Sequence, residues 1–317
     1  MNMKFFQPAR ESVTFVALSF ILISTTSFAI SKRFATPVAE PVVKKNVLGV
    51  EEGFLPPAPF LIDNFSVPII SAQAVLAYDI DSGIALFEKN PDAPLLPAST
   101  TKIITALVSL DYFGLETILK VNGDFIDGQK MELIAGERIL VDDLLHGLLI
   151  ASANDAAQVL ANNYPGGTDN FVVAMNAKAR QLGMSNSFFV NPSGLDAEGQ
   201  VSTARDLVRI SNYAMRNPYF AQIVGTKETL VKSTDGRIIH KLTNINKLLG
   251  EVPGVLGVKT GWTENARENL VTYVERDGRR VMIAVLGSQD RFGETEELID
   301  WIFKNYEWEE VSPPAAY

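Results

Sequence analysis

The chain has 317 residues, of which 47% are hydrophobic, so it is long enough for one large domain or two small ones. Its formal net charge of −9 argues against nucleic acid as a partner, because binding to a phosphate backbone requires clustered Lys and Arg. Cysteine is absent, which excludes disulfides, thiolate nucleophiles, cysteine-built metal sites and an N-terminal lipid on Cys.

The first 30 residues combine a basic flank with an apolar run. Lys4 and Arg10 precede 18 residues without charge, Val13 to Ile30. This pattern predicts an export signal or an N-terminal membrane anchor, and Ser27 and Ala29 form a small-x-small pattern suited to cleavage. The run reaches the lower length limit of a transmembrane helix, which slightly favours an anchor over a cleaved signal. Either alternative gives an extracytoplasmic location, in the periplasm or at the outer face of the cytoplasmic membrane.

Residues 31–72 are rich in proline and keep no period of 2 or 3.6, so we expect a tether there. A globular body is expected over residues 73–307, followed by a tail over 308–317. Within the body, two β-like runs on either side of Asp81-Ser82-Gly83 predict a hairpin. The apolar spacing after Thr100 then predicts a helix that stops at Gly114.

A mostly helical middle is expected next. Residues 141–152 and 154–164 predict two helices separated by a break. A third helix should begin with Thr168 and Asp169 in cap positions, and a fourth should begin near Ser202 and Thr203.

The C-terminal part returns to strand character. A strand is expected over residues 255–261, followed by two β runs joined by Asp277-Gly278, a strong hairpin signal, and by a last helix over residues 294–306. Strands at both ends with helices between them predict an α+β domain. Its terminal strands should pair in one antiparallel sheet, with flanking helices and a mostly helical subdomain.

Ser99 and Lys102 lie three residues apart at a predicted helix start, so their side chains can share one face. A Lys acts as a base only when neutral, and burial, a nearby cation or the positive end of a helix lowers its pKa. Taken alone, this spacing is more often an ordinary helix start with a solvated Lys.

Two further motifs follow in order. Ser152-Ala153-Asn154 stands at the break between two apolar helices, where polar residues need partners such as a cleft supplies. Lys259-Thr260-Gly261 ends a strand and offers a positive charge, a hydroxyl group and space for a substrate backbone.

Histidine chemistry is not predicted. His146 lies in an apolar helical run and His240 ends a strand-like run, and neither belongs to a recognisable Ser-His-Asp arrangement. Metal-binding spacings such as H-E-x-x-H are absent, so we expect no metal.

In this order, the three motifs resemble those of the low-molecular-mass penicillin-binding proteins, the serine-type D-alanyl-D-alanine carboxypeptidases. The resemblance runs from about residue 73 to residue 303 and includes PASTTK, GLLIASANDAA, NPSGLD, STARDL, GVKTGWT and DGRRVMIAVLGS. It implies the fold of serine β-lactamases and penicillin-binding proteins. It also implies peptidoglycan stem peptides as substrates and β-lactams as covalent inhibitors, with no metal or organic cofactor.

The resemblance assigns catalytic roles by position. Ser99 is expected to be the acylated nucleophile and Lys102 its general base. Ser152 is expected to relay a proton to the leaving D-alanine, and Asn154 to orient Lys102 and the substrate amide.

The same resemblance assigns the binding residues. Lys259 and Thr260 are expected to bind the terminal carboxylate, beside the space left by Gly261. The backbone N–H groups of Ser99 and Trp262 are expected to form the oxyanion hole, and the Trp262 ring a wall of the cleft.

The chain departs from the family pattern at two places. Gln200-Val201 stands where an aromatic residue or His is frequent, and Arg267 stands where Gly is usual. We expect Arg267 to add bulk and charge beside the strand that carries Lys259, which would favour a free terminal D-alanine over a cross-linked stem. Arg291 could bind a carboxylate or form an exposed ion pair. Three acidic residues are expected on a solvated helical face: Glu294, Glu296 and Glu297.

Other functions stay open at this point. A D,D-endopeptidase that cleaves cross-links would use the same chemistry as a carboxypeptidase. A class A β-lactamase would need a Glu in an E-x-x-L-N setting between the second and third motifs, and the sequence has none. A non-catalytic wall-binding protein would not need a nucleophile together with its base.

Overall fold

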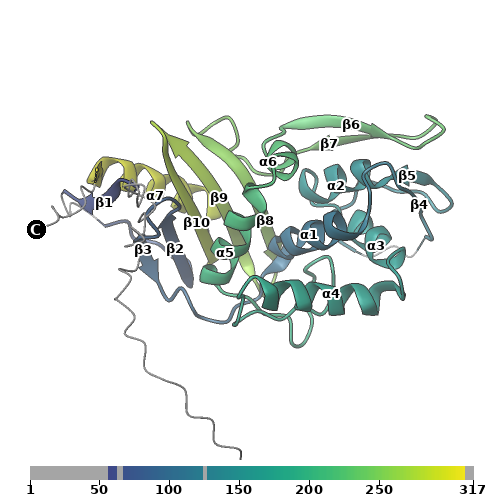
Figure 1. The fold of residues 1–317 in the computed structure, drawn as a ribbon, viewed down its shortest axis with the longest axis horizontal. Helices are drawn as coiled ribbons and strands as arrows, with labels where there is room; N and C mark the ends of the chain where they lie inside the picture. Colours follow the sequence, from purple (N-terminus) through teal and green to yellow (C-terminus); the bar gives the residue numbers. More distant parts are fainter. Residues whose placement is uncertain (1–55, 63–66, 124–126, 311–317) are drawn as a thin grey trace, which may run out of the picture. The chain divides into compact units, whose positions relative to one another are not determined.

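The computed structural model describes residues 56–62, 67–123 and 127–310. Five strands form one antiparallel sheet in the order β3-β2-β10-β9-β8 (Figure 1). The N-terminal part supplies β2 (Ala74–Asp79) and β3 (Ala85–Lys89), and the C-terminal part supplies β8 (Val255–Thr263), β9 (Arg267–Arg276) and β10 (Arg279–Ser288). Because β10 pairs with β2, the predicted meeting of the terminal strands in one sheet is confirmed.

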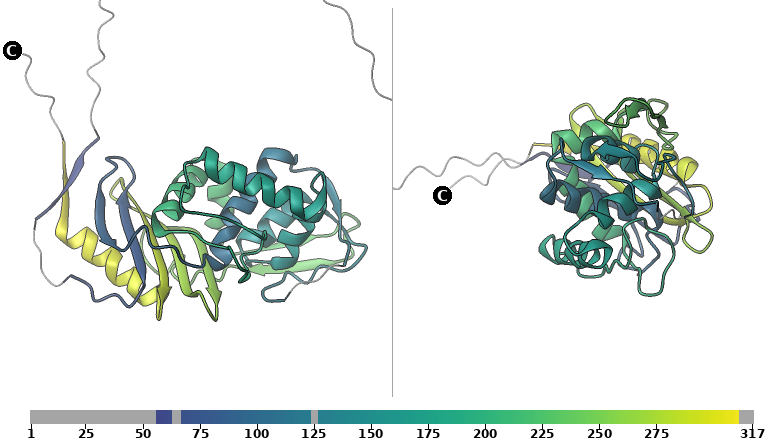
Figure 2. Two further views of the ribbon diagram at one scale, coloured as in Figure 1. Left: turned by 90° about the horizontal axis from the view of Figure 1, so that it is seen from below. Right: turned by 90° about the vertical axis from the view of Figure 1, so that its right-hand side faces the viewer.

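The sheet separates two hydrophobic cores. Side chains alternate across a strand, so Leu76 of β2 packs into one core while Val75 and Ala77 pack into the other. The second core is covered by α7 (Arg291–Asn305), and the first by α1 (Lys102–Tyr112) and α5 (Ala204–Met215). Figure 2 (left) shows α7, in yellow, on one side of the sheet and the teal helices on the other.

The helical subdomain holds the remaining helices and two small two-stranded sheets. Its helices are α2 (Val141–Leu149), α3 (Asn154–Asn162), α4 (Gly167–Gln181) and α6 (Pro218–Val224). Its strand pairs are β4 (Ile118–Lys120) with β5 (Arg138–Leu140), and β6 (Glu228–Lys232) with β7 (Ile239–Thr243).

Two helix starts test the cap predictions. Thr203 caps α5, since its side chain accepts a hydrogen bond from Asp206 N at 3.1 Å. The cap predicted for α4 is wrong, because that helix begins at Gly167 after Gly166, which has a left-handed φ of +81°. Thr168 lies inside the helix, where its hydroxyl donates to Asn162 Oδ1 at 2.7 Å.

Neither strand of the outermost pair was predicted. β1 (Ala58–Leu61) pairs with β11 (Tyr306–Glu309), so one strand lies within the expected tether and the other overlaps the expected tail. Because β1 contains proline, its sequence does not indicate a strand, although proline is tolerated on edge strands. The folded part of the chain therefore includes residues outside the expected 73–307.

Glu294 is also an exception to the expected solvated face of α7. It is buried and accepts hydrogen bonds from Ser71 N and Ser288 Oγ, both at 2.5 Å, whereas Glu296 and Glu297 are exposed. Glu294 thus ties the segment before β2 to the end of β10.

The predicted export signal or anchor over residues 1–30 lies outside the described residues. Across the ranges that the structure describes, none of the helices combines the length and the apolar character needed to cross a membrane.

Candidate active site

Ser99 lies in a short 3₁₀ turn, Ala98–Thr101, that leads directly into α1. Gly261 of β8 packs tightly against this turn, since a Cβ atom on it would lie 3.1 Å from both Pro97 O and Ser99 N. The close approach favours glycine and brings the end of β8 beside the Ser99 turn. Ser99 itself is only partly buried, so its hydroxyl stays accessible.

Lys102 is the first residue of α1, and its side chain is fully buried. Its Nζ lies 2.9 Å from Ser99 Oγ, 2.6 Å from Asn154 Oδ1 and 2.5 Å from Ser193 O. Burial, and then the positive charge of Lys259, hold the pKa of Lys102 well below its usual value. A neutral amine can donate its two N–H groups to the two carbonyl oxygens and turn its lone pair to Ser99.

The second motif stands at the junction of α2 and α3. Ser152 adopts a left-handed φ of +58°, and Asn154 is the first residue of α3. The Asn154 amide donates through Nδ2 to Asp127 O at 2.6 Å, which directs its oxygen to Lys102. The next residue, Asp155, accepts from the backbone N–H of Met131 at 3.1 Å, so the segment that faces Asn154 is held in place.

The third motif brings a second buried amine to the site. Lys259 Nζ donates to Ser152 Oγ at 2.8 Å and to Thr260 O at 3.1 Å. Burial, and then the charge of Arg291, lower the pKa of Lys259 to about 7. The structure therefore connects side chains of the three predicted motifs in two hydrogen-bonded groups, Ser99–Lys102–Asn154 and Ser152–Lys259.

Two polar groups next to Lys259 are suited to an anionic ligand. Thr260 Oγ1 is buried and has no hydrogen-bond partner among the described residues. Arg291 is partly buried and donates from Nη1 to Gly261 O at 2.8 Å, and within the described part of the chain it forms no ion pair. Trp262 follows Gly261 with 61% of its surface exposed, which suits a cleft wall.

Sequence reasoning missed the part played by residues 190–195. Ser193 contributes only its carbonyl group, and Gly194, at φ +87°, packs so closely that a Cβ would lie 1.9 Å from Ala98 O. Gln200, noted in the sequence only as a departure, is buried and accepts from Val190 N at 2.8 Å and Asn191 N at 3.3 Å. Every residue has a backbone carbonyl, so the pattern of side chains cannot show which carbonyl faces the site. The turn motif Asn-Pro-Ser-Gly was the signal that could have indicated this segment.

Arg267 lies beside the strand that carries Lys259, as expected, but toward the end of that strand. In the pairing of β8 with β9, Arg267 lies opposite Thr263, whereas Lys259 lies opposite Val271. Four residues of strand separate the two positions by about 13 Å, so Arg267 is not beside the Lys259 amine. Its φ of +61° falls in the left-handed region, which explains why glycine suits this position.

Neither histidine is hydrogen-bonded to Ser99. His146 Nδ1 lies 2.8 Å from Asp142 O, and the buried His240 contacts Glu137 Oε1 at 2.8 Å and Met131 O at 2.7 Å. A search of the described residues finds no group of three or more His, Asp or Glu side chains placed to hold a metal ion. The arrangement is suited to nucleophilic acyl transfer with an amine as the base.

Comparisons with known proteins agree with this geometry. A family model described as D-alanyl-D-alanine carboxypeptidase matches residues 63–290. A D-alanyl-D-alanine carboxypeptidase of Mycobacterium tuberculosis is 38% identical over 252 residues, which cover 75% of this chain and 85% of the relative. One from Bacillus subtilis is 33% identical over 246 residues, which cover 74% of this chain but only 63% of that longer relative. A solved structure of a D-alanyl-D-alanine carboxypeptidase from M. tuberculosis superposes with a TM-score of 0.71 at 34% identity, covering 81% of this chain and 98% of the other.

Proposed function

The chain belongs to the family of serine-type D-alanyl-D-alanine carboxypeptidases, and from this premise we propose that Ser99 is the nucleophile that removes the terminal D-alanine from peptidoglycan stem peptides. Members of this family act on the cell wall, so the enzyme works outside the cytoplasm. The observation that carries the assignment of Ser99 is the buried Lys102 amine, which lies 2.9 Å from its hydroxyl.

Acylation begins when Ser99 Oγ attacks the carbonyl carbon between the two D-alanines. The hydroxyl proton passes to the neutral Nζ of Lys102, and the carbonyl oxygen becomes an oxyanion. The backbone N–H groups of Ser99 and Trp262 would stabilise this charge, because Gly261 brings β8 against the Ser99 turn.

The tetrahedral intermediate collapses when the C–N bond breaks. The leaving nitrogen takes a proton from Lys102 through Ser152, whose hydroxyl is held by Lys259. D-alanine departs as a free amino acid, and the donor peptide stays bound to Ser99 as an ester. A water molecule, deprotonated by Lys102, then hydrolyses the ester and regenerates the Ser99 hydroxyl.

The terminal carboxylate of the substrate would bind to three groups near the end of β8. Thr260 offers a buried hydroxyl without a partner in the described structure, and Lys259 and Arg291 offer positive charge. Charge-assisted hydrogen bonds of this kind are roughly twice as strong as neutral ones. A free carboxylate at this place marks a chain end, which supports a carboxypeptidase over a D,D-endopeptidase.

Two further parts of the proposal extend beyond the site. β-lactams should acylate Ser99, because their strained amide resembles acyl-D-alanyl-D-alanine. Residues 13–30 would attach the enzyme to the membrane or direct its export, with the proline-rich segment after them as the connection to the catalytic domain.

The proposal is tested with the full chain and two defined substrates, a stem pentapeptide and a cross-linked dimer. We expect faster release of D-alanine from the pentapeptide than cleavage of the dimer, and no reaction with Ser99→Ala. Faster cleavage of the dimer would make the enzyme an endopeptidase. Turnover of the pentapeptide by Ser99→Ala at the wild-type rate would refute the assignment of the nucleophile.

A further inference from the structure

A cavity of about 320 Å³ lies between α5, the strand β2 and Leu182 beyond the end of α4. β10 and β9 stand between β2 and β8, so three strand spacings, about 14 Å, separate β2 from the strand that carries Lys259. None of the residues that line this cavity belongs to the catalytic motifs. It is therefore a separate site, and its function does not depend on the roles proposed for Ser99 and Lys102.

Arginine side chains are concentrated in this cavity. Arg205, Arg209 and Arg216 all line it, and no acidic side chain does, although the chain as a whole carries a net charge of −9. The first two lie four residues apart on α5 and the third lies seven residues, about two turns, beyond them. This spacing places the three guanidinium groups on one side of the helix.

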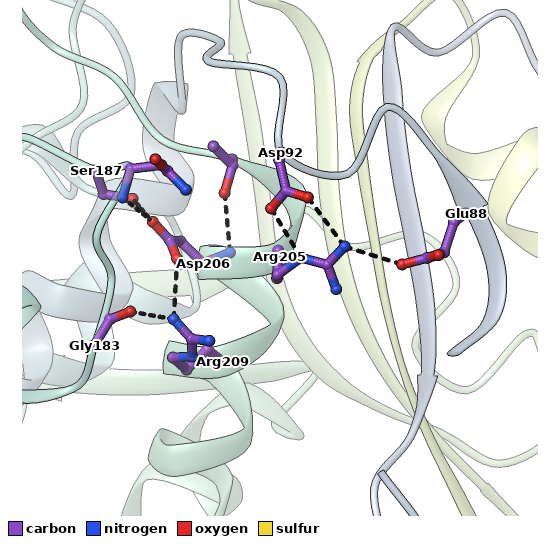
Figure 3. A network of polar contacts seen from close by, with 9 residues as sticks. Glu88, Asp92, Gly183, Ser187, Arg205, Asp206 and Arg209 are labelled. Carbon is purple, nitrogen blue, oxygen red and sulfur yellow. Dashed lines mark hydrogen bonds and ion pairs between the residues drawn. The ribbon is translucent and has the colours of Figure 1, made fainter. Parts of the chain in front are cut away.

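Two of the guanidinium groups are held in fixed positions by partners outside the lining (Figure 3). Arg205 donates from Nε and Nη2 to Asp92 at 2.8 and 3.1 Å, and from Nη2 to Glu88 at 3.0 Å. Arg209 donates from Nη1 to Gly183 O and to Asp206 Oδ1. Such rigid groups lose little conformational entropy when a ligand binds.

Donor groups remain available for a ligand. Among the described residues, Nη1 of Arg205 and both Nε and Nη2 of Arg209 have no hydrogen-bond acceptor. The side chain of Arg216 is exposed and forms neither a hydrogen bond nor an ion pair within the same ranges. Each of the three arginines that line the cavity therefore keeps donor groups that a ligand could use.

The number of donors indicates the kind of anion. A phosphate offers more oxygens than a carboxylate and presents them in more directions, so it suits several separated guanidinium groups better. Leu76, Val208 and Leu182 supply an apolar part of the lining, and Tyr78 and Asn212 supply groups that can hydrogen-bond to hydroxyls. We propose that this cavity binds the phosphate group of a polyol phosphate ester, with its carbon chain against the apolar lining.

The test titrates the full chain with inorganic phosphate and with glycerol 3-phosphate and follows binding by calorimetry. Arg216→Gln removes a charge that has no partner in the described structure. Arg216→Lys keeps the charge but lacks the planar, two-pronged set of guanidinium N–H donors. Arg237→Gln is the matched control, since Arg237 is an exposed arginine on the turn after β6 and has no part in the cavity. Labelling by a fluorescent penicillin should be the same for all variants and shows that they are folded.

We expect saturable binding of glycerol 3-phosphate to the wild type, weaker at high salt. Arg216→Gln should bind at least fivefold more weakly, Arg216→Lys should be intermediate, and Arg237→Gln should stay within twofold of the wild type. The proposal is overturned if the wild type shows no saturable binding, or if Arg216→Gln and Arg237→Gln have the same effect.

A second arm distinguishes the source of the phosphate. The full-chain variants are compared on phosphatidylcholine vesicles with and without phosphatidylglycerol, and since all of them share one N-terminus, a difference between them reports on the cavity. Loss of binding by Arg216→Gln on anionic vesicles as well as in solution identifies a lipid headgroup as a ligand. If Arg216→Gln loses binding in solution but not on anionic vesicles, the ligand is a soluble polyol phosphate. If Arg216→Gln loses binding in neither arm, the proposal is contradicted.

Discussion

Capture of substrates with a free carboxylate should weaken above pH 7, because Lys259 loses its charge there. Burial and the neighbouring Arg291 lower the pKa of this amine to about 7 in the free enzyme. The ratio kcat/KM reports on groups of the free enzyme, so it should follow the fraction of Lys259 that is protonated. Two pH units above the pKa, roughly 1% of the amine is charged, and kcat/KM should be about 100-fold lower than below the pKa.

The assay compares an N-acylated D-alanyl-D-alanine peptide with its C-terminal amide between pH 6 and pH 9. Both substrates need Ser99 and a neutral Lys102, so titration of Lys102 affects both equally. The amide has no carboxylate to bind to Lys259, and the ratio of the two kcat/KM values therefore isolates this amine. We expect the ratio of acid to amide to fall with pH, approaching tenfold per unit above pH 7. A ratio that stays constant over the range would refute the proposed role of Lys259.

The remaining predictions concern single side chains. Lys102→Ala should slow acylation by a fluorescent penicillin by about 10²- to 10⁴-fold, and a loss below tenfold would contradict its role as the base. Arg267→Gly should raise the free energy of unfolding by about 1 kcal/mol in denaturant titrations, because glycine adopts a positive φ without strain. Arg267→Ala retains the strain and should not raise it. Equal effects of the two substitutions would rule out backbone strain at this position. The pKa of Lys259 is lower in the folded than in the unfolded chain, so the unfolded chain binds more protons between pH 7 and 10.5 and stability should rise with pH there. Lys259→Met should reduce this rise, leaving the part contributed by Lys102, whose pKa burial also lowers, and an unchanged slope would contradict the low pKa of Lys259. Gln200→Ala should cost about 1–3 kcal/mol of stability, since the backbone N–H groups of Val190 and Asn191 lose their acceptor, and a loss below 0.5 kcal/mol would show that water replaces it.

Local signals in the sequence were sufficient for much of the fold. The hairpins at Asp81-Ser82-Gly83 and Asp277-Gly278 follow from turn residues that allow the required backbone angles, and Thr203 caps its helix as the residue type predicts. The pairing of β1 with β11 depends instead on contacts between distant parts of the chain. Neither strand has a pattern of its own, so no local rule could reveal it.

The site was predictable where the chemistry lies in side chains of the three motifs. Ser99 and Lys102 come together as their spacing suggested, and Asn154 contacts Lys102 as the family resemblance implied. The carbonyl of Ser193 was not predictable, because every residue has one and only the fold selects it.

Two details of the structure depend on the fold and not on the local sequence. Arg267 is near Lys259 in the sequence, but strand pairing places it opposite Thr263, and register is not visible in one strand alone. Glu294 was assigned to solvent because its neighbours are acidic. It is buried because two backbone N–H groups, of Ser71 and Ala72, and the Ser288 hydroxyl need an acceptor.

The assignment of Ser99 is tested most directly by mass spectrometry of the full chain after brief exposure to benzylpenicillin. A single adduct is predicted, on the peptide that contains Ser99, and the same treatment of Ser99→Ala should leave the chain unmodified. An adduct on any other residue, or an adduct on Ser99→Ala, would contradict the account of this site as a serine acyl-transfer centre.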